Sequence, residues 1–409
     1  MQFALLGDHP DGLGMAAALV ASGRHHFLAY SGPVSGLPAL HRFQPAPRIV
    51  GDLEEVLADS DIEAVIVAVG SSLRAAYLRR ALQSEHHVLC VHPADPSPDV
   101  AYEAALIQGD TGRVLLPLLP MTFHPGIARL ADLSRQWPFV PVNPPLAQSS
   151  LGGTRLLELE IWGTEEIVLG TDGLRNRPGL PGWDVLRFVG GEISEVFLLS
   201  SAAALAAGQT CLVSGRFQNG GLYQATYLPN QASAQLRLAL VTTTGRATLH
   251  FSEGWPGPSL LSFADEQGVN RVEQWEAFHP WMRIVERFEE AVLETTMKRQ
   301  GPGKPAEESL TKPTPRLGWL DELRGLELNE AVRRSAERGR SNTLDLQEAT
   351  EEASFKGTMT LLGCSLIWLS LIVLILATWI PWLAWLILPV FGVFLIMQVV
   401  RLILPSHGR

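Results

Sequence analysis

The sequence predicts an α/β protein in which a Rossmann-like parallel-sheet domain precedes an α+β domain with an open antiparallel sheet, followed by two transmembrane helices. Short, fully apolar runs alternate with helical patterns over residues 1–120, and longer alternating runs fill 121–298. Between Lys356 and Arg401 there is no charged side chain and no histidine. A chain of 409 residues has room for two cores, because single cores stop growing at roughly 250–300 residues.

The first domain, residues 1–120, is expected to be a sheet of parallel strands. Most of the short apolar runs in residues 1–120 are followed by a helical pattern. Asp52 stands where it would cap one of these helices. Fully apolar strands separated by helices are typical of a parallel sheet that is covered on both faces, as in dinucleotide-binding folds. The expected strands lie at 2–6, 27–31, 48–51, 64–70, 87–92 and 113–120.

The second domain, residues 121–298, is expected to form the open antiparallel sheet. Runs such as LLELEIWG and AQLRLALVTTTG alternate apolar and polar residues, and an amphipathic helix around 279–294 closes the domain. The segments that follow are a Pro-rich linker, a helix that packs back on the body and a juxtamembrane segment, at 299–318, 319–341 and 342–357.

The last apolar stretch has the length of a membrane hairpin. Residues 358–404 accommodate two spans of about 20 residues, with Pro381 between them and three tryptophans close to that turn. Lys356 precedes the first span, and Arg401 and Arg409 lie at or after the end of the second. This distribution of positive charge places both ends and the globular body on the cytoplasmic side. The alternative is a buried hairpin inside a globular protein.

Composition excludes several classes of partner. The chain has 32 Lys and Arg against 42 Asp and Glu, a net charge of -10, which repels nucleic acid. Its three cysteines form no disulfide or metal-ligand pattern, so no metal site is expected. The N-terminus, MQFALLGDHP, lacks the basic start of a secretory signal.

Three phrases of the sequence resemble the Gfo/Idh/MocA family, the relatives of glucose-fructose oxidoreductase and inositol dehydrogenase. They are DLEEVLADSDIEAVIVAVGSSLRAAYLRRALQSEHHVLCVHP at 52–93, GWDVLRFVGGEISEV at 182–196 and LELNEAVRRSAERGR at 326–340. The resemblance covers residues 1 to about 341. It implies NAD or NADP as cofactor, hydride transfer on sugars, polyols and related small molecules, and the open sheet as the surface of a homo-oligomer.

The phosphate-binding turn of the expected fold departs from the usual G-x-G-x-x-G pattern. Gly7 and Gly12 hold its first and third positions, while His9 holds the middle one, where a side chain takes room from the pyrophosphate. The strand that normally ends in an acidic ribose ligand ends here in Ser31, which can hydrogen-bond a ribose or a 2'-phosphate. Weakened or altered cofactor binding is expected.

The proton-transfer positions that the resemblance implies are also altered. His92 stands where the family's EKP motif has its lysine, and it can serve as a general acid or base and as a cofactor contact. A loop histidine with no catalytic task is the alternative. Asp184 matches the aspartate of the family's H-x-x-D segment, but the histidine position is Pro181.

Two functions therefore stay open on the sequence. One is a membrane-anchored oxidoreductase with a degenerate NAD(P) site, acting on a small sugar-like or polyol substrate with His92 in place of the lysine. The other is a non-catalytic nucleotide or metabolite sensor, or a scaffold, at the membrane. The joint replacement at His9, Ser31, His92 and Pro181 favours the second function.

Overall fold

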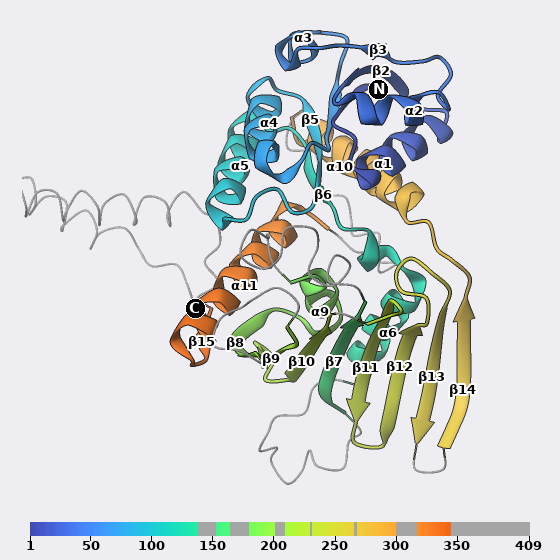
Figure 1. Ribbon diagram of the computed structural model, residues 1–409, viewed down its shortest axis with the longest axis vertical. Helices are drawn as coiled ribbons and strands as arrows, with labels where there is room; N and C mark the ends of the chain where they lie inside the picture. The colour runs from blue at the N-terminus through green and yellow to red at the C-terminus, as the bar shows by residue number, and fades with distance from the viewer. Residues whose placement is uncertain are drawn as a thin grey trace, which may run out of the picture. The chain divides into compact units, whose positions relative to one another are not determined.

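The computed structural model describes residues 1–137, 153–163, 180–200, 209–229, 231–265, 268–299 and 317–344. They contain two sheets, both within one compact unit that spans Met1–Asp345. Figure 1 shows the two sheets with their helices.

The first sheet has six parallel strands in the order β3-β2-β1-β4-β5-β6. Its strands are β1 (Gln2–Leu6), β2 (His26–Ser31), β3 (Arg48–Ile49), β4 (Ala64–Val67), β5 (His87–Val91) and β6 (Leu115–Leu118). The helices among them are α1 (Pro10–Ala21), α2 (Leu37–Leu40), α3 (Leu53–Leu57), α4 (Ser71–Gln83) and α5 (Pro98–Thr111). The predicted Rossmann-like sheet is confirmed, and its strand order reverses between β1 and β4, where such folds form a ligand crevice.

Glycines at the start of α1 allow this helix to approach the sheet closely. Gly7 has a φ of 100°, and a Cβ added to it would lie 2.3 Å from the carbonyl oxygen of Ala68. A Cβ on Gly12 would lie 2.3 Å from the Ala68 Cβ. Both positions of the turn thus require glycine for packing, and the N-terminus of α1 lies at the end of β4.

The second sheet has nine strands in the order β14-β13-β12-β11-β7-β10-β9-β8-β15. Most neighbours are antiparallel, as predicted, but β7 and β10 pair in parallel, so the sheet is mixed. The chain passes from β7 through α9 and the β8–β9 pair before it returns beside β7, and a long crossover of this kind is what parallel pairing needs. Its strands are β7 (Thr154–Trp162), β8 (Ile193–Ser200), β9 (Cys211–Phe217), β10 (Leu222–Leu228), β11 (Gln235–Thr242), β12 (Gly245–Phe251), β13 (Ser259–Asp265), β14 (Gly268–Trp275) and β15 (Asn342–Thr343).

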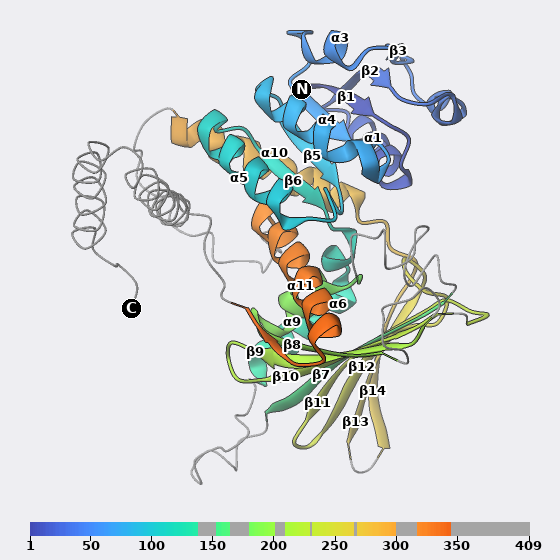
Figure 2. The ribbon, with the colours of Figure 1, turned by 60° about the vertical axis from the view of Figure 1, so that its left-hand side comes forward.

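Three helices lie on one side of the second sheet, as Figure 2 shows: α6 (Pro125–Gln136), α9 (Trp183–Gly190) and α11 (Trp319–Arg338). Helix α11 enters two cores. Leu328, Ala331 and Val332 pack with the second sheet. Trp319 and Leu323 pack with the first sheet and with α5. Helix α11 therefore contributes side chains to the cores of both sheets.

Helix α10 (Trp281–Arg299) packs in the core of the first domain. Ile284, Val285 and Phe288 are buried there beside α1 and the first strands. The sequence places this helix at the end of the second domain, because amphipathic periodicity identifies an apolar face without identifying what covers it.

No helix of the described ranges is long and apolar enough to cross a membrane. The two expected spans at 358–404, together with most of the linker and of the juxtamembrane segment, lie outside those ranges.

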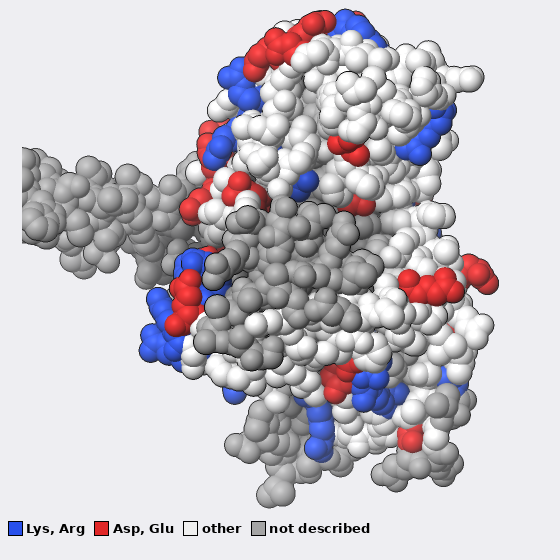
Figure 3. Space-filling view, in the orientation of Figure 1, with Lys and Arg blue, Asp and Glu red and all other residues white. Residues whose placement is uncertain are grey.

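On the face seen in Figure 3, acidic and basic side chains lie close to one another. Ion pairs such as Arg80 with Glu54 and Arg79 with Glu103 join opposite charges on the first domain.

The close approach of α1 gives a test of the fold. Gly12→Ala places a Cβ against Ala68 and is expected to lower the free energy of unfolding by about 1–3 kcal/mol, the usual cost of overpacking. Urea unfolding followed by circular dichroism measures this loss. The matched control is Gly109→Ala in α5, where a Cβ meets nothing within 4 Å, so it should be neutral or slightly stabilising. Equal effects of the two substitutions would contradict the packing described.

Candidate functional site

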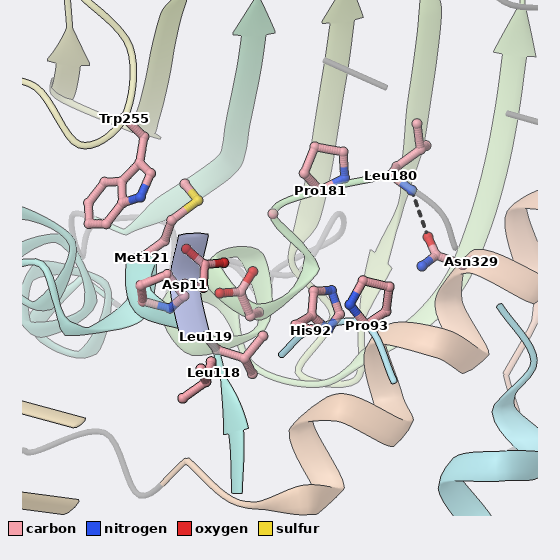
Figure 4. Close-up of a pocket in the computed structure, with 13 residues that line it drawn as sticks. Asp11, His92, Pro93, Leu118, Leu119, Met121, Leu180, Pro181, Trp255 and Asn329 are labelled. Carbon is pink, nitrogen blue, oxygen red and sulfur yellow. Dashed lines mark hydrogen bonds between the residues drawn. The ribbon is translucent and has the colours of Figure 1, made fainter. Parts of the chain in front are cut away.

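A cavity of about 300 Å³ lies at the carboxyl ends of β5 and β6. Its walls come from the β1–α1 turn, the ends of those two strands, the start of α9, the segment after β12 and helix α11 (Figure 4). In open α/β sheets, ligands bind outside the carboxyl ends of the strands. The lining residues are Asp11, His92, Pro93, Leu118, Leu119, Pro120, Met121, Leu180, Pro181, Gly182, Asp184, Trp255 and Asn329.

His92 is held in this cavity by a buried carboxylate from α11. Its Nδ1 lies 2.6 Å from Oε2 of Glu322, and Oε1 of Glu322 accepts the backbone N–H of Ala94 at 2.7 Å. The Glu322 side chain has no exposed surface, whereas a third of the His92 side chain is exposed. A carboxylate bound to Nδ1 favours the tautomer with a proton on Nδ1, which leaves Nε2 as the nitrogen for a ligand.

The charges around His92 favour its protonated form. Burial acts to lower the pKa of His92, but the Glu322 carboxylate, through its charge and its hydrogen bond, outweighs burial. Asp184 adds to this effect, Arg74 opposes it, and the net pKa is raised above the ordinary value for histidine.

Asp184 is the second titratable group that the sequence singled out, and it lines the same cavity as His92. It lies in the first turn of α9, where burial raises the pKa of its carboxyl group. The neighbouring His92 and the backbone N–H groups of Val185 and of Asp184 itself oppose that rise. The pair thus combines a histidine that holds its proton with a carboxyl group that gains one readily, which suits proton exchange.

The segment before α9 is fixed by two polar side chains. Oδ1 of Asn329 accepts the backbone N–H of Leu180 at 3.0 Å and the indole N–H of Trp183 at 2.6 Å. The Tyr227 hydroxyl donates to the carbonyl of Pro181 at 2.9 Å. Pro181 therefore faces the cavity on a rigid segment, but its side chain has no proton to exchange.

Arg74 braces the segment that carries His92. Its Nε and Nη2 donate to the Val69 carbonyl at 3.1 and 2.9 Å, and Nη1 donates to the Pro93 carbonyl at 2.7 Å. This buried guanidinium joins the segments that follow β4 and β5, so it positions the cavity wall through the backbone.

The backbone of the β1–α1 turn has the close approach that a dinucleotide site needs. The side chains at the start of α1 differ from those of the usual G-x-G-x-x-G motif. Gly7 and Gly12 keep the close approach that the fold needs. Nδ1 of His9 accepts the backbone N–H of Asp11 at 3.2 Å, which takes up one donor that a phosphate would use. Burial lowers the pKa of His9, so the ring is neutral at pH 7, while burial raises the pKa of the Asp11 carboxyl group.

Ser31 lies beside the turn and away from the cavity. Its backbone carbonyl accepts the N–H of Gly7 at 2.7 Å, and the residue is buried at the end of β2. The predicted residues thus form two groups. Gly7, His9, Gly12 and Ser31 surround the turn, while His92 and Asp184 share the cavity, which Asp11 borders from the turn.

Glu322, Asn329 and Arg74 belong to the site but are not among the residues that the sequence predicted. A signal for Glu322 was present in WLDELRGL, because this glutamate lies three residues after Trp319 and four before Leu326, on the face of the helix that is apolar. A glutamate on such a face needs a buried partner. The partner itself lies 230 positions away in the sequence. Among the described residues, no group of three or more His, Cys, Asp or Glu side chains could hold a metal ion.

A six-stranded parallel sheet joined to an open mixed sheet of nine strands defines a Rossmann-type fold with a second α+β domain. Residues 38–116 match the Gfo/Idh/MocA family, described as an oxidoreductase family with an NAD-binding Rossmann fold. This match lies within the first domain and agrees with the resemblance seen in the sequence. NAD or NADP is the cofactor class of that fold.

Known proteins are similar to this chain at low sequence identity. D-xylose 1-dehydrogenase (NADP(+)) 2 of Haloferax volcanii is 28% identical over 134 residues, which is 32% of this chain and 41% of that protein's length. The solved structure of GenD2 from gentamicin A biosynthesis, in complex with NAD, has a TM-score of 0.62 at 20% identity and covers 84% of this chain and 96% of its own. The WlbA dehydrogenase from Bordetella pertussis, in complex with NADH and UDP-GlcNAcA, has a TM-score of 0.61 at 15% identity and covers 85% of this chain and 99% of its own.

Removing the carboxylate partner of His92 tests the electrostatics of the cavity. Glu322→Gln is expected to lower the pKa of His92, because burial then acts with little opposition. Titration of the His92 ring by NMR measures the shift. Glu337→Gln, at an exposed position of the same helix, is the control and should leave the His92 pKa unchanged. An unchanged pKa in Glu322→Gln would contradict the described pair.

The same pair predicts how stability depends on pH. The folded protein binds the His92 proton more tightly than the unfolded chain does. The resulting stabilisation is fully present below the unfolded-state pKa of about 6.5 and is lost as the pH rises through the folded-state pKa. The difference in unfolding free energy between the wild type and Glu322→Gln should therefore be larger near pH 5.5 than near pH 8.5. Urea denaturation at the two pH values measures it, and a difference that grows with pH would overturn the prediction.

Proposed function

We propose that this chain is an NAD(P)-dependent oxidoreductase that converts a hydroxyl group of a sugar-like or polyol substrate to a carbonyl, or the reverse. The observation that carries the proposal is the buried Glu322–His92 pair at the carboxyl end of β5, in one cavity with Asp184. Burial of the Glu322 carboxylate costs free energy that its bonds to His92 and to the N–H of Ala94 must offset. The pair holds the His92 ring in one orientation toward the cavity, which a histidine in a solvated loop would not have.

The cofactor, when bound, supplies or accepts the hydride. In the proposed reaction Nε2 of His92 gives a proton to the substrate oxygen or takes one from it, while Glu322 holds the ring through Nδ1. Asp184 is the neighbouring group that exchanges the proton with His92. The backbone around Gly7 and Gly12, with His9 and Ser31, would hold the dinucleotide at the turn.

The names of the similar proteins support the class of substrate. One is a D-xylose dehydrogenase, and another was solved with UDP-GlcNAcA. The polar groups that border the cavity, His92, Asp11, Asp184 and Asn329, are of the kinds that bind hydroxyl groups.

A non-catalytic nucleotide or metabolite sensor, or a scaffold, is the second candidate. It is favoured by the His9 ring, which takes up the Asp11 N–H, and by Pro181 at the place of the family's histidine. Saturable NADH or NADPH binding without turnover of any polyol or sugar would support this candidate.

His92→Ala separates the two candidates. If His92 transfers the proton, kcat for the best substrate of a polyol and sugar panel should fall by about 100- to 10,000-fold, with little change in NAD(P)H affinity. His26→Ala is the matched control, because His26 is an exposed histidine at the opposite end of a strand in the same sheet. Steady-state kinetics and fluorescence titration measure the two quantities, and unchanged turnover would clear His92 of a catalytic role.

We further infer that residues 358–404 tether the protein to a membrane as a two-span hairpin with the body on the cytoplasmic side. The support is the uncharged apolar run between Lys356 and Arg401. The full chain should stay in the membrane pellet after alkaline carbonate extraction, and a chain ending at residue 345 should be released. Release of the full chain would contradict the anchor.

We also propose that the side of the second sheet left open by α6, α9 and α11 is a surface for self-association, as the family resemblance implies (Figure 2). Light scattering of the detergent-solubilised chain tests this, and a monomer at micromolar concentration would count against it.

A further inference from the structure

The strand that usually supplies a ribose-binding carboxylate has none in this chain. In NAD-binding Rossmann domains an acidic side chain near the end of the second strand accepts hydrogen bonds from the adenine ribose. Here β2 ends with Tyr30 and Ser31 and continues into Gly32 and Pro33.

Tyr30 cannot take that role, because its hydroxyl group is already used inside the protein. The side chain is fully buried, and its Oη donates to the Pro33 carbonyl at 3.0 Å. Gly32 and Gly36 pack over this hydroxyl so closely that a Cβ on either would lie 2.5 or 2.2 Å from it.

A carboxylate nevertheless lies beside the end of β2, and it comes from the turn that follows the neighbouring strand β1. Asp8 follows Gly7 in the β1–α1 turn, and the N–H of Gly7 is bonded to the carbonyl of Ser31, the last residue of β2. Oδ2 of Asp8 accepts the Ser35 hydroxyl at 2.7 Å. The Cβ of Asp8 lies 2.8 Å from where a Cβ of Gly36 would stand. The Asp8 carboxylate is therefore fixed over the segment that follows β2, and the described residues offer no hydrogen bond to its Oδ1.

The basic side chains of the segment between β2 and β3 do not offset this charge by an ion pair. His41 and Arg42 are the titratable residues of 32–47. Arg42 donates to the Leu13 carbonyl of α1 at 2.9 Å and lies over the Phe43 ring, 5.1 Å from its centroid.

We propose that Asp8 replaces the missing acid of β2 and makes the protein selective for NAD(H) over NADP(H). Oδ1 of Asp8 accepts the 2'-hydroxyl of the adenine ribose, and a 2'-phosphate at that place meets a fixed negative charge. Ser35 holds the carboxylate in position through Oδ2. The inference rests on the proposed dinucleotide binding and adds the form of the dinucleotide and the residue that selects it. It also separates this chain from the Haloferax relative, whose name specifies NADP.

Direct binding to the full chain in detergent, by fluorescence or calorimetric titration with NADH and NADPH, tests the proposal. The wild type should bind NADH at least about tenfold more tightly than NADPH, as expected for like charges at a ligand site. Asp8→Asn keeps the shape and removes the charge, so it should erase most of this ratio. Asp8→Ser also makes room and should tighten NADPH binding relative to the wild type.

Asp11→Ser is the matched control, because Asp11 is the other aspartate of the same turn but borders the cavity near His92. It should change the affinities for both nucleotides by a similar factor and leave their ratio unchanged. Circular dichroism of each variant establishes that it is folded.

The failures of the two proposals can be told apart. Tighter binding of NADPH by the wild type, or an unchanged ratio in both Asp8 variants, would overturn the role of Asp8 and leave the oxidoreductase proposal standing. Binding of neither nucleotide at millimolar concentration would overturn both.

Discussion

The geometry of the site depends on Glu322, which joins helix α11 to the segment that follows β5. A carboxylate without exposed surface is tolerated only if its oxygens are bonded, and here His92 and the N–H of Ala94 bond one oxygen each. Helix α11, which carries Glu322, packs Leu328 and Val332 into the core of the second sheet. The pair therefore joins helix α11, which packs on the second sheet, to the segment that follows β5 in the first.

Two clusters of polar groups follow from this arrangement, and they differ in their electrostatic character. His92 and Asp184 line the same cavity, and the pKa of each is raised above its ordinary value. At the β1–α1 turn, His9 is neutral and acts as a helix cap. The turn thus offers a phosphate its backbone and the N-terminus of α1, without a cationic side chain from residues 7–12.

In the sequence, the residues that replace the family's motif residues look like lost functional groups. In the structure, these residues make specific contacts. His92 has a buried partner, and Pro181 belongs to a segment that Tyr227 and Asn329 hold in place. Asp8 lies beside the end of β2, a strand with no acidic side chain, and accepts the Ser35 hydroxyl. A buried ion pair beside a cavity costs free energy to keep, and this pair is the observation that supports the proposed role of His92.

The sequence by itself determined the features that depend on local pattern. Apolar runs separated by helices predict the parallel sheet, and Asp52 caps its helix as expected. His92 was singled out by its match to the EKP motif of the family that the sequence resembles. Periodicity and strand ends are properties of neighbouring residues, so one chain is enough to see them. The pairing of Glu322 with His92, the packing of α10 on the first domain and the parallel contact of β7 with β10 were decided by tertiary structure. Each joins residues far apart in the chain, and an apolar face or a buried charge requires a partner without specifying which one.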